Sequence, residues 1–271
     1  MKNKLLITLI SFIFLQTHIT NAMDAPGQRI AILAFGSLVE NPGNLPLKER
    51  DGFKSNGQQG PGMRIEYARK SNDGRLTLVV APGINARELK SYFATFNGNN
   101  VNDAIAALRE REGTIADNIG YINLLNRTYR RKDFNGNTGA IEVKKGQIGD
   151  NYYQQNPMLQ RIMAWAQAHN YTAVIWTDLP PTFTKTTFNR NALQEHLAHL
   201  DLLALLKSYC YFKITPDEIR NGTQFGNDLI NFSAGILRAR APEVAEILRG
   251  KGIRNNFENL TNADCIKIIW G

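Results

Sequence analysis

Apolar runs separated by turn-forming residues recur along the first two thirds of the chain, and they predict short buried strands. The stretches 29–35 and 172–177 are almost continuously apolar, which is typical of strands buried on both faces. Two more strands at 63–68 and 75–81 flank a Ser-Asn-Asp-Gly sequence, which favours a hairpin turn because Asp-Gly tolerates positive φ. Two weaker strands are expected at 121–129 and 139–143. Residues 41–62 are rich in Gly, Pro and Asn, and a long loop is expected there.

Helical spacing dominates the last third of the chain. The leucines with this spacing are Leu193, Leu197, Leu200 and Leu203. An earlier helix ends near residue 112, where Gly113 can terminate it, and Asn102 or Asp103 can cap its start. Further helices are predicted at 157–169, 216–221 and 228–248. This order predicts an α+β fold, because the elements alternate too irregularly for a doubly wound parallel sheet.

The first 22 residues have the pattern of a secretory signal peptide. Lys2 and Lys4 form a basic start, residues 5–15 are apolar apart from two hydroxyl side chains, and Ala22 is a small residue suited to cleavage. The apolar run is shorter than the roughly 20 residues that a membrane-spanning helix needs. The sequence therefore predicts an exported protein of 249 residues, periplasmic or extracellular, with no membrane association after cleavage.

Composition excludes few function classes but disfavours nucleic-acid binding. Hydrophobic residues make up 43% of the chain and charged residues 21%, which are ordinary globular values. The net charge of +8 becomes +6 when the two signal-peptide lysines leave, and the basic residues are scattered. The one basic cluster is Arg127, Arg130, Arg131 and Lys132. Nucleic-acid binding predicts a whole basic face with interleaved aromatics, whereas short charge runs usually lie on solvated surface, so we interpret this cluster as a solvated turn.

Both cysteines, Cys210 and Cys265, belong to the mature chain. An oxidising compartment permits a disulfide between them, and the alternative is a pair of buried free thiols. The sequence leaves both alternatives open, and it contains no paired-cysteine spacing typical of a metal site.

Glu112 occupies an unusual position for a carboxylate. Val101, Ile105 and Leu108 form an apolar stripe on the predicted helix, and Glu112 continues that stripe in the last turn. Burial and the negative end of the helix dipole both favour the neutral acid and would raise its pKa. Such a group can accept and return a proton near neutral pH. The alternative is that Glu112 points into water or pairs with Arg109.

The loop Phe35-Gly36-Ser37-Leu38 follows the first buried strand. Glycine allows backbone N–H groups to approach a ligand closely, and consecutive N–H groups can hold a carboxylate or a developing oxyanion. An ordinary strand-ending turn is the alternative interpretation. The spacing fits neither a nucleophile elbow nor a P-loop.

Together these segments resemble the gamma-glutamylcyclotransferase-like superfamily. The resemblance rests on AILAFGSLVENPGNL after the first strand and on ALREREG around Glu112, in this order. The segments IEYARKSNDGRLTLVV and AVIWTDLPPTF are similar to a bacterial branch of that superfamily, so the resemblance spans residues 29–183. Phe35 stands where the family commonly has a tyrosine, and Leu38 is like the branch that acts on glutathione.

The resemblance implies a small mixed β-barrel with surrounding helices at 23–185, and leaves 186–271 as a mostly helical part packed on it. It also implies an enzyme that cyclises the γ-glutamyl group of small amides or peptides to 5-oxoproline, with release of an amine or amino acid. Glu112 is then the catalytic acid and base, and Phe35, Gly36, Ser37 and Leu38 bind the substrate. Neither a cofactor nor a metal is implied.

Three other functions compete with this expectation. The same fold can serve as an exported, non-catalytic binding module. Glu195, His196 and His199 share a predicted helix and include a histidine pair that can bind metal, although the usual zinc-helix spacing is absent. Hydrolysis through Ser37 lacks a partner base that can be identified in the sequence.

Overall fold

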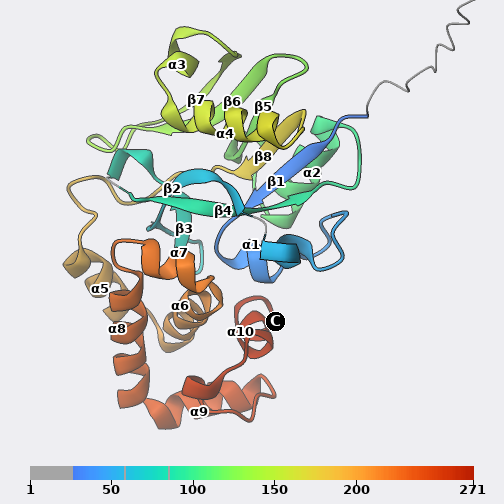
Figure 1. Ribbon diagram of the computed structural model, residues 1–271. Helices are drawn as coiled ribbons and strands as arrows, with labels where there is room; N and C mark the ends of the chain where they lie inside the picture. The colour runs from blue at the N-terminus through green and yellow to red at the C-terminus, as the bar shows by residue number, and fades with distance from the viewer. Residues whose placement is uncertain (1–26, 58, 85) are drawn as a thin grey trace, which may run out of the picture.

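The computed structural model describes residues 27–271 apart from Gln58 and Asn85, so the predicted signal peptide lies outside the described residues. Its strands are β1 (Ile30–Ala34), β2 (Gln59–Lys70), β3 (Leu76–Val80), β4 (Glu88–Thr95), β5 (Ile119–Asn123), β6 (Thr128–Phe134), β7 (Ile141–Gln147) and β8 (Ala173–Thr177). They form one mixed sheet in the order β3-β2-β4-β1-β8-β5-β6-β7 (Figure 1). The α+β class is therefore confirmed.

β1 lies in the middle of this sheet, antiparallel to β4 and parallel to β8. Its apolar run is buried on both faces, as predicted. Ile32 and Ala34 belong to a core that also includes buried residues of helix α2 (Val101–Arg111), whereas Leu33 and Phe35 belong to the larger core on the other face. Because β1 and β8 are parallel neighbours, their carboxyl ends meet at one edge of the sheet.

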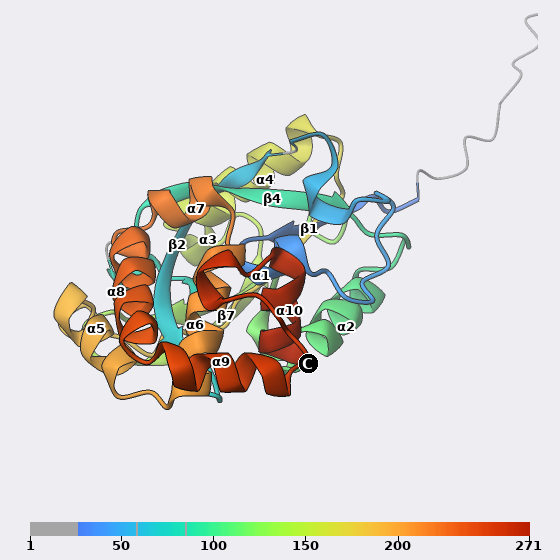
Figure 2. The ribbon, with the colours of Figure 1, turned by 90° about the horizontal axis from the view of Figure 1, so that it is seen from below.

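The remaining helices are α1 (Ser37–Glu40), α3 (Asn151–Gln154), α4 (Pro157–Ala168), α5 (Arg190–Ala198), α6 (Leu202–Ile214), α7 (Asp217–Gly222), α8 (Gly226–Ala239), α9 (Ala241–Gly250) and α10 (Asn262–Trp270). From residue 190 onward the chain is mainly helical, and these helices gather beside β2 and β3 (Figure 1). Helix α6 is buried around most of its circumference and packs against α8 and α10. Figure 2 shows α10 next to α1, where the Asn262 side chain donates a 3.0 Å hydrogen bond to Glu40.

Several local predictions are confirmed. The hairpin turn joins β2 to β3 with Gly74 at φ 83°, and a strand and a helix occupy 173–177 and 157–168. The helix before Gly113 exists, but Asn100 caps it rather than Asn102 or Asp103. The Asn100 side chain accepts from the N–H of Asn102 at 2.8 Å, so the helix begins at Val101, earlier than predicted.

The single strand predicted at 121–129 is wrong, because the chain turns back between β5 and β6. Asn123 ends β5, and its side chain accepts hydrogen bonds from the N–H groups of Leu125 and Asn126. Arg130, Arg131 and Lys132 of the basic cluster consequently lie in β6, whereas Arg127 lies in the exposed turn before it, as predicted. Arg131 is 1% exposed, and its guanidinium donates to the carbonyl of Lys132.

Three other boundaries differ from the predictions. The patterning did not reveal β4, whose first residues are polar and partly exposed although the strand lies inside the sheet. β2 begins at Gln59, inside the loop predicted at 41–62. The helix predicted at 228–248 is divided at Arg240 into α8 and α9. Pro242 lies in the first turn of α9, where its missing N–H costs nothing, and it disfavours a continuous helix.

A barrel closed by strand pairing is not observed among the described residues, because β3 and β7 form the two edges of the sheet. The sheet instead curls until loops near its edges touch. A Cβ added to Gly83 would lie 2.8 Å from the backbone nitrogen of Gly136, so both loops need glycine at this contact. The mixed sheet is therefore open, and the loops that contain Gly83 and Gly136 make contact near its edges.

Glu66 is a fully buried carboxylate on β2 that ties the C-terminal helices to the sheet. Its Oε2 accepts from the N–H of Gln224 at 2.6 Å, and its Oε1 accepts from the N–H of Tyr67 at 3.0 Å. Burial raises the pKa of Glu66 to about 7, against the lowering effect of these hydrogen bonds. The contact between the sheet and the segment before α8 therefore depends on a group that titrates near neutral pH.

We expect this group to make folding stability fall as pH rises. A pKa of about 7 in the folded state and 4.5 in the unfolded state means that stabilisation is complete below pH 4.5 and lost as pH rises through 7. The loss is at most about 3 kcal/mol. Urea unfolding at pH 5 and pH 8 should show a smaller fall in stability in Glu66→Gln than in the wild type, because other buried carboxyls with raised pKa values, such as Glu112, contribute the rest of the slope. The exposed Glu195→Gln variant should retain the wild-type slope, and a slope in Glu66→Gln equal to that of the wild type would contradict the assignment.

Cys210 of α6 and Cys265 of α10 lie together as free, buried thiols. Burial raises the pKa of the Cys210 thiol well above its usual value. We therefore expect alkylating reagents to leave both thiols unmodified in the folded protein and to label two thiols per chain after unfolding without reductant. If no thiol is labelled after unfolding without reductant, the two residues are joined by a disulfide.

Candidate functional site

A cavity of about 590 Å³ opens where β1 and β8 end. Its wall combines the loop after β1, the hairpin between β2 and β3, the C-terminal end of α2, and single residues from α6 and α10. Of the residues singled out by the sequence, Phe35, Ser37, Leu38 and Glu112 line this cavity. The structure thus brings the FGSL loop and Glu112 to one place, although they are separated by more than 70 positions in the chain.

Gly36 turns the chain from β1 into α1. Its φ of 67° lies in the left-handed region, and a Cβ at this position would lie 2.6 Å from the hydroxyl oxygen of Tyr211. Only glycine can both adopt this positive φ without strain and leave room for the Tyr211 hydroxyl. The N–H groups of Ser37 and Leu38, which follow it, belong to the first turn of α1, where backbone donors lack intrahelical acceptors.

Glu112 is the C-cap of α2, and a Schellman motif fixes it. Gly113 adopts φ 57°, its N–H donates to the carbonyl of Glu110 at 3.1 Å, and the N–H of Thr114 donates to the carbonyl of Arg109 at 3.1 Å. Val101 and Leu108 of the predicted stripe are buried. The side chain of Glu112 is only 19% exposed and lines the cavity.

The charge of Glu112 is only weakly compensated. Burial raises the pKa of the Glu112 carboxyl, and the neighbouring Arg111 guanidinium lowers it. Arg111 lies 3.7 Å from Glu112 and also donates to the backbone carbonyl of Asn41, with its Nε at 3.2 Å. This anchor holds the end of α2 against the segment that follows α1. The net effect is a carboxyl group that ionises at higher pH than an ordinary glutamate.

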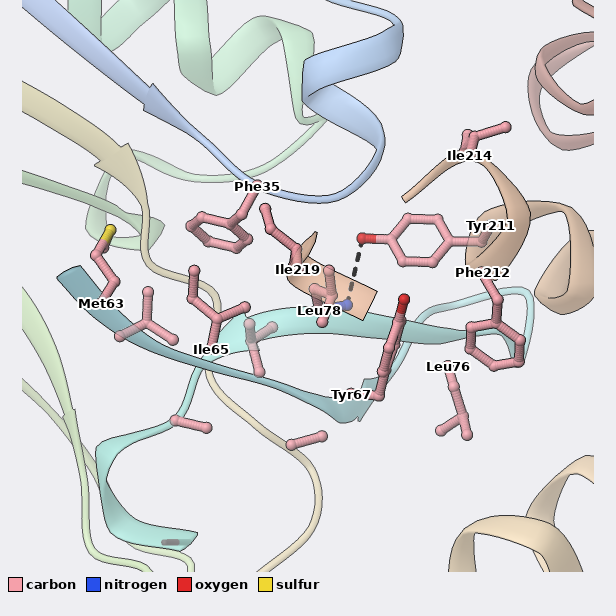
Figure 3. Packing of buried hydrophobic residues seen from close by; sticks show 14 of the residues in the cluster. Phe35, Met63, Ile65, Tyr67, Leu76, Leu78, Tyr211, Phe212, Ile214 and Ile219 are labelled. Atoms are coloured by element: carbon pink, nitrogen blue, oxygen red, sulfur yellow. Dashed lines mark hydrogen bonds between the residues drawn. The ribbon is translucent and has the colours of Figure 1, made fainter. Parts of the chain in front are cut away.

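Tyr211, from α6, is a cavity residue that the sequence analysis missed. Its hydroxyl oxygen accepts from the N–H of Leu78 at 3.2 Å (Figure 3). Because β3 is an edge strand, this N–H has its acceptor outside the sheet. Burial raises the pKa of Tyr211, the Leu78 hydrogen bond lowers it, and the nearby Glu112 carboxylate raises it further. The Ser37 side chain also lies beside Tyr211 and lowers its pKa.

An ion-paired carboxylate and one aromatic side chain are also part of the cavity wall. Asp73 accepts from Arg75 Nε at 2.9 Å and lies 3.4 Å from Lys207, and these hydrogen bonds and cations lower the pKa of Asp73 to about 2 despite its burial. Trp270 of α10 stands between Arg75 and Arg111, whose guanidinium carbons lie 6.0 and 5.7 Å from its ring centroid. The last turn of α10 thus contributes to the cavity wall.

The competing metal site is not assembled. His196 bonds with the carbonyl of Gly74 through Nε2 at 2.7 Å, and His199 bonds with the carbonyl of Glu195 through Nδ1 at 2.7 Å. In the described part of the chain, no cluster of three or more His, Cys, Asp or Glu side chains is arranged to hold a metal ion.

Ser37 lines the cavity, but no histidine of the described residues joins it there as a base.

Over the same part of the chain, no helix combines the length and apolar character needed to cross a membrane.

Comparisons of the chain with protein-family models, with curated proteins and with solved structures find no match. The functional assignment therefore depends on the FGSL and REREG motifs and on the cavity that contains both.

Proposed function

We propose that this chain is a gamma-glutamylcyclotransferase-like enzyme that converts small γ-glutamyl amides or peptides to 5-oxoproline and a free amine or amino acid. The observation that carries the proposal is the position of Glu112, a carboxyl of raised pKa, in one cavity with the FGSL loop. A cavity of about 590 Å³ is within the range of sites for small molecules.

The reaction is an intramolecular acyl transfer. Glu112 removes a proton from the α-ammonium group of the substrate, and the freed amine attacks the γ-carbonyl carbon. A new C–N bond closes the five-membered ring and leaves two hydrogens on the attacking nitrogen. Glu112 returns the first proton to the leaving nitrogen as the original C–N bond breaks, and it then removes the second proton from the ring nitrogen. The second proton leaves with the product amine as its ammonium ion, so atoms and charge balance without water or a redox partner, and Glu112 is ionised again. Because the nucleophile and the carbonyl share one molecule, a site that holds the glutamyl chain folded supplies much of the rate advantage.

Hydrogen-bond donors in the same cavity as Glu112 stabilise the developing charge in this proposal. Attack places negative charge on the carbonyl oxygen, and the N–H groups of Ser37 and Leu38 and the hydroxyl of Tyr211 are the available donors. Phe35 has no hydroxyl to donate, and Tyr211 supplies a phenol hydroxyl in the same cavity. The C-terminal helices are therefore part of the proposed active site, through α6.

The direct test is product formation. Protein beginning at Met23 is incubated with glutathione, γ-glutamyl dipeptides and γ-glutamyl amines, and 5-oxoproline is quantified by mass spectrometry. We expect 5-oxoproline from at least one class of compound. If no compound yields 5-oxoproline above the level of Glu112→Gln, the chain is not a cyclotransferase, and the non-catalytic binding module becomes the better assignment.

Export is part of the same proposal. A protein with the predicted signal peptide meets γ-glutamyl compounds in the periplasm or outside the cell, where cytosolic glutathione is not the default substrate. The chemistry requires no nucleotide or redox cofactor, so it can proceed in that compartment. Detection of the mature protein in the periplasmic or extracellular fraction, with Met23 as its first residue, would test this location.

A further inference from the structure

Arg69 is a half-buried cation in the cavity wall that forms no ion pair with any described acidic side chain. Its Nη1 donates to the carbonyl of Pro180 at 3.0 Å, which uses one of the five N–H donors of a guanidinium. Burial lowers the pKa of Arg69, because water is removed from the charge without an anion to replace it. A cation in this environment is a binding group for an anionic ligand.

A β-bulge turns Arg69 toward the cavity. The pairing of β2 with β3 shifts between Tyr67 and Arg69, so that Arg69 lies opposite Thr77. Without the shift it would lie opposite Leu76, which is fully buried in the core. Residues directly opposite each other share a face of the sheet, and Arg69 and Thr77 both line the cavity. The bulge therefore keeps a charged side chain out of the core and directs it into the site.

Thr177 provides a second group on the same wall. It is the last residue of β8, it lines the cavity, and it is only 9% exposed. Its Oγ1 is buried and has no hydrogen-bond partner among the described residues. Pro180, which accepts from Arg69, follows Thr177 by three residues. A buried hydroxyl without a partner costs free energy unless a ligand bonds with it.

The other cavity arginines are already paired. Arg75 is paired with Asp73, and Arg111 lies beside Glu112. Glu110, the remaining acidic side chain of the wall, is exposed on α2 and is not ion-paired with Arg69. Arg69 is thus the cavity cation whose charge a substrate can satisfy.

We infer that Arg69 and Thr177 form a carboxylate-binding subsite, which holds one carboxylate of the γ-glutamyl substrate. The inference rests on the proposed function for the identity of the substrate. A γ-glutamyl amino acid offers two carboxylates, the α-carboxylate of the glutamyl group and that of the leaving amino acid. The guanidinium donates to one carboxylate oxygen or both, and the Thr177 hydroxyl donates to the same group.

Calorimetric binding to Glu112→Gln protein tests the subsite without turnover. The probes are γ-glutamylalanine, γ-glutamylethylamide, which lacks the leaving-group carboxylate, and 4-aminobutanoylalanine, which lacks the α-carboxylate. Arg69→Met should weaken binding of γ-glutamylalanine by about 10- to 100-fold, the contribution of a charge-assisted hydrogen bond. One of the other two probes lacks the carboxylate that Arg69 binds, and Arg69→Met should not change the affinity for that probe. The carboxylate missing from the unaffected probe is therefore the one that Arg69 holds. Arg64→Met, an exposed arginine of the same strand outside the cavity, should leave all three affinities unchanged.

Thr177→Val separates binding from folding. Valine keeps the shape and removes a hydroxyl that bonds with no described group, so the melting temperature should not fall. Binding of γ-glutamylalanine should weaken by about 2- to 10-fold. The inference is overturned if Arg69→Met changes every affinity by less than twofold, if Arg64→Met has the same effect as Arg69→Met, or if none of the three probes binds.

The two proposals fail independently. If wild-type protein makes no 5-oxoproline while binding still depends on Arg69, the proposed function fails and the subsite stands. If 5-oxoproline is formed with a kcat/KM that neither Arg69→Met nor Thr177→Val alters, the subsite fails and the proposed function stands.

Discussion

Glu112→Gln should reduce 5-oxoproline formation by about 10²- to 10⁴-fold, the usual contribution of general acid–base catalysis. Glutamine has the same shape but can neither accept the proton of the α-ammonium group nor return it to the leaving amine. The folded structure should be unaffected. Because burial raises the pKa of Glu112, removing its charge should leave the melting temperature at neutral pH equal or higher.

Asp103→Asn is the matched control for this variant. It makes the same carboxylate-to-amide change on the same helix, at an exposed position that does not line the cavity. We expect its kcat/KM to equal that of the wild type. If Glu112→Gln retains wild-type kcat/KM, the acid–base role is wrong, whatever the stability of the variant.

The pH profile adds a test of the same group. Glu112 must be ionised to act as a base, so kcat/KM should fall as pH decreases through its pKa. Because that pKa is raised by burial, the acid limb of the profile should lie above the ordinary glutamate value of 4.5. An acid limb at or below 4.5 would contradict a buried base.

Tyr211→Phe should lower kcat by about 10²- to 10³-fold, comparable to the removal of one donor from an oxyanion hole. The variant also leaves the buried N–H of Leu78 without its acceptor, which should cost about 1–3 kcal/mol in the free energy of unfolding. Figure 3 shows the tyrosine hydroxyl directed at the backbone of β3, beside Phe35 and Leu78. Both losses come from one oxygen atom that joins α6 to the sheet and to the cavity.

Kinetics and urea unfolding measured on the same preparation separate the two losses. Tyr209→Phe is the control, because it makes the same change on the same helix at a ring that packs against Phe257 outside the cavity. We expect Tyr209→Phe to retain wild-type kcat. A Tyr211→Phe variant that unfolds more easily yet retains kcat within twofold would assign Tyr211 a role in folding alone.

The residues that local patterning predicted well are those whose structure depends on a few neighbours. The apolar run that forms β1 is continuous enough to indicate burial on both faces, and the Asp-Gly turn of the first hairpin needs only its own backbone conformation. Gly113 likewise ends α2 through hydrogen bonds within the last turns of that helix. These signals extend over a few residues, so they can be recognised in the sequence alone.

Elements whose burial depends on distant partners were predicted less well. β4 begins with polar residues because its outer end is partly exposed, yet it lies between β2 and β1 in the sheet. Arg131 looked like part of a solvated turn because charged residues are usually exposed, but β6 takes it into the interior. In both cases the neighbouring strands, and not the local pattern, determine what is buried.

The sequence by itself determined that Glu112 ends a helix on its apolar stripe and that Gly36 ends a buried strand. Only the tertiary structure decided that Glu112 shares a cavity with the neighbours of Gly36 in the FGSL loop and with Tyr211, Arg69 and Thr177. The contact between Arg69 and Pro180 spans 111 positions, and that between Leu78 and Tyr211 spans 133. Helix and turn propensities act within a few residues, whereas this cavity is assembled by packing between segments that no local pattern relates to one another.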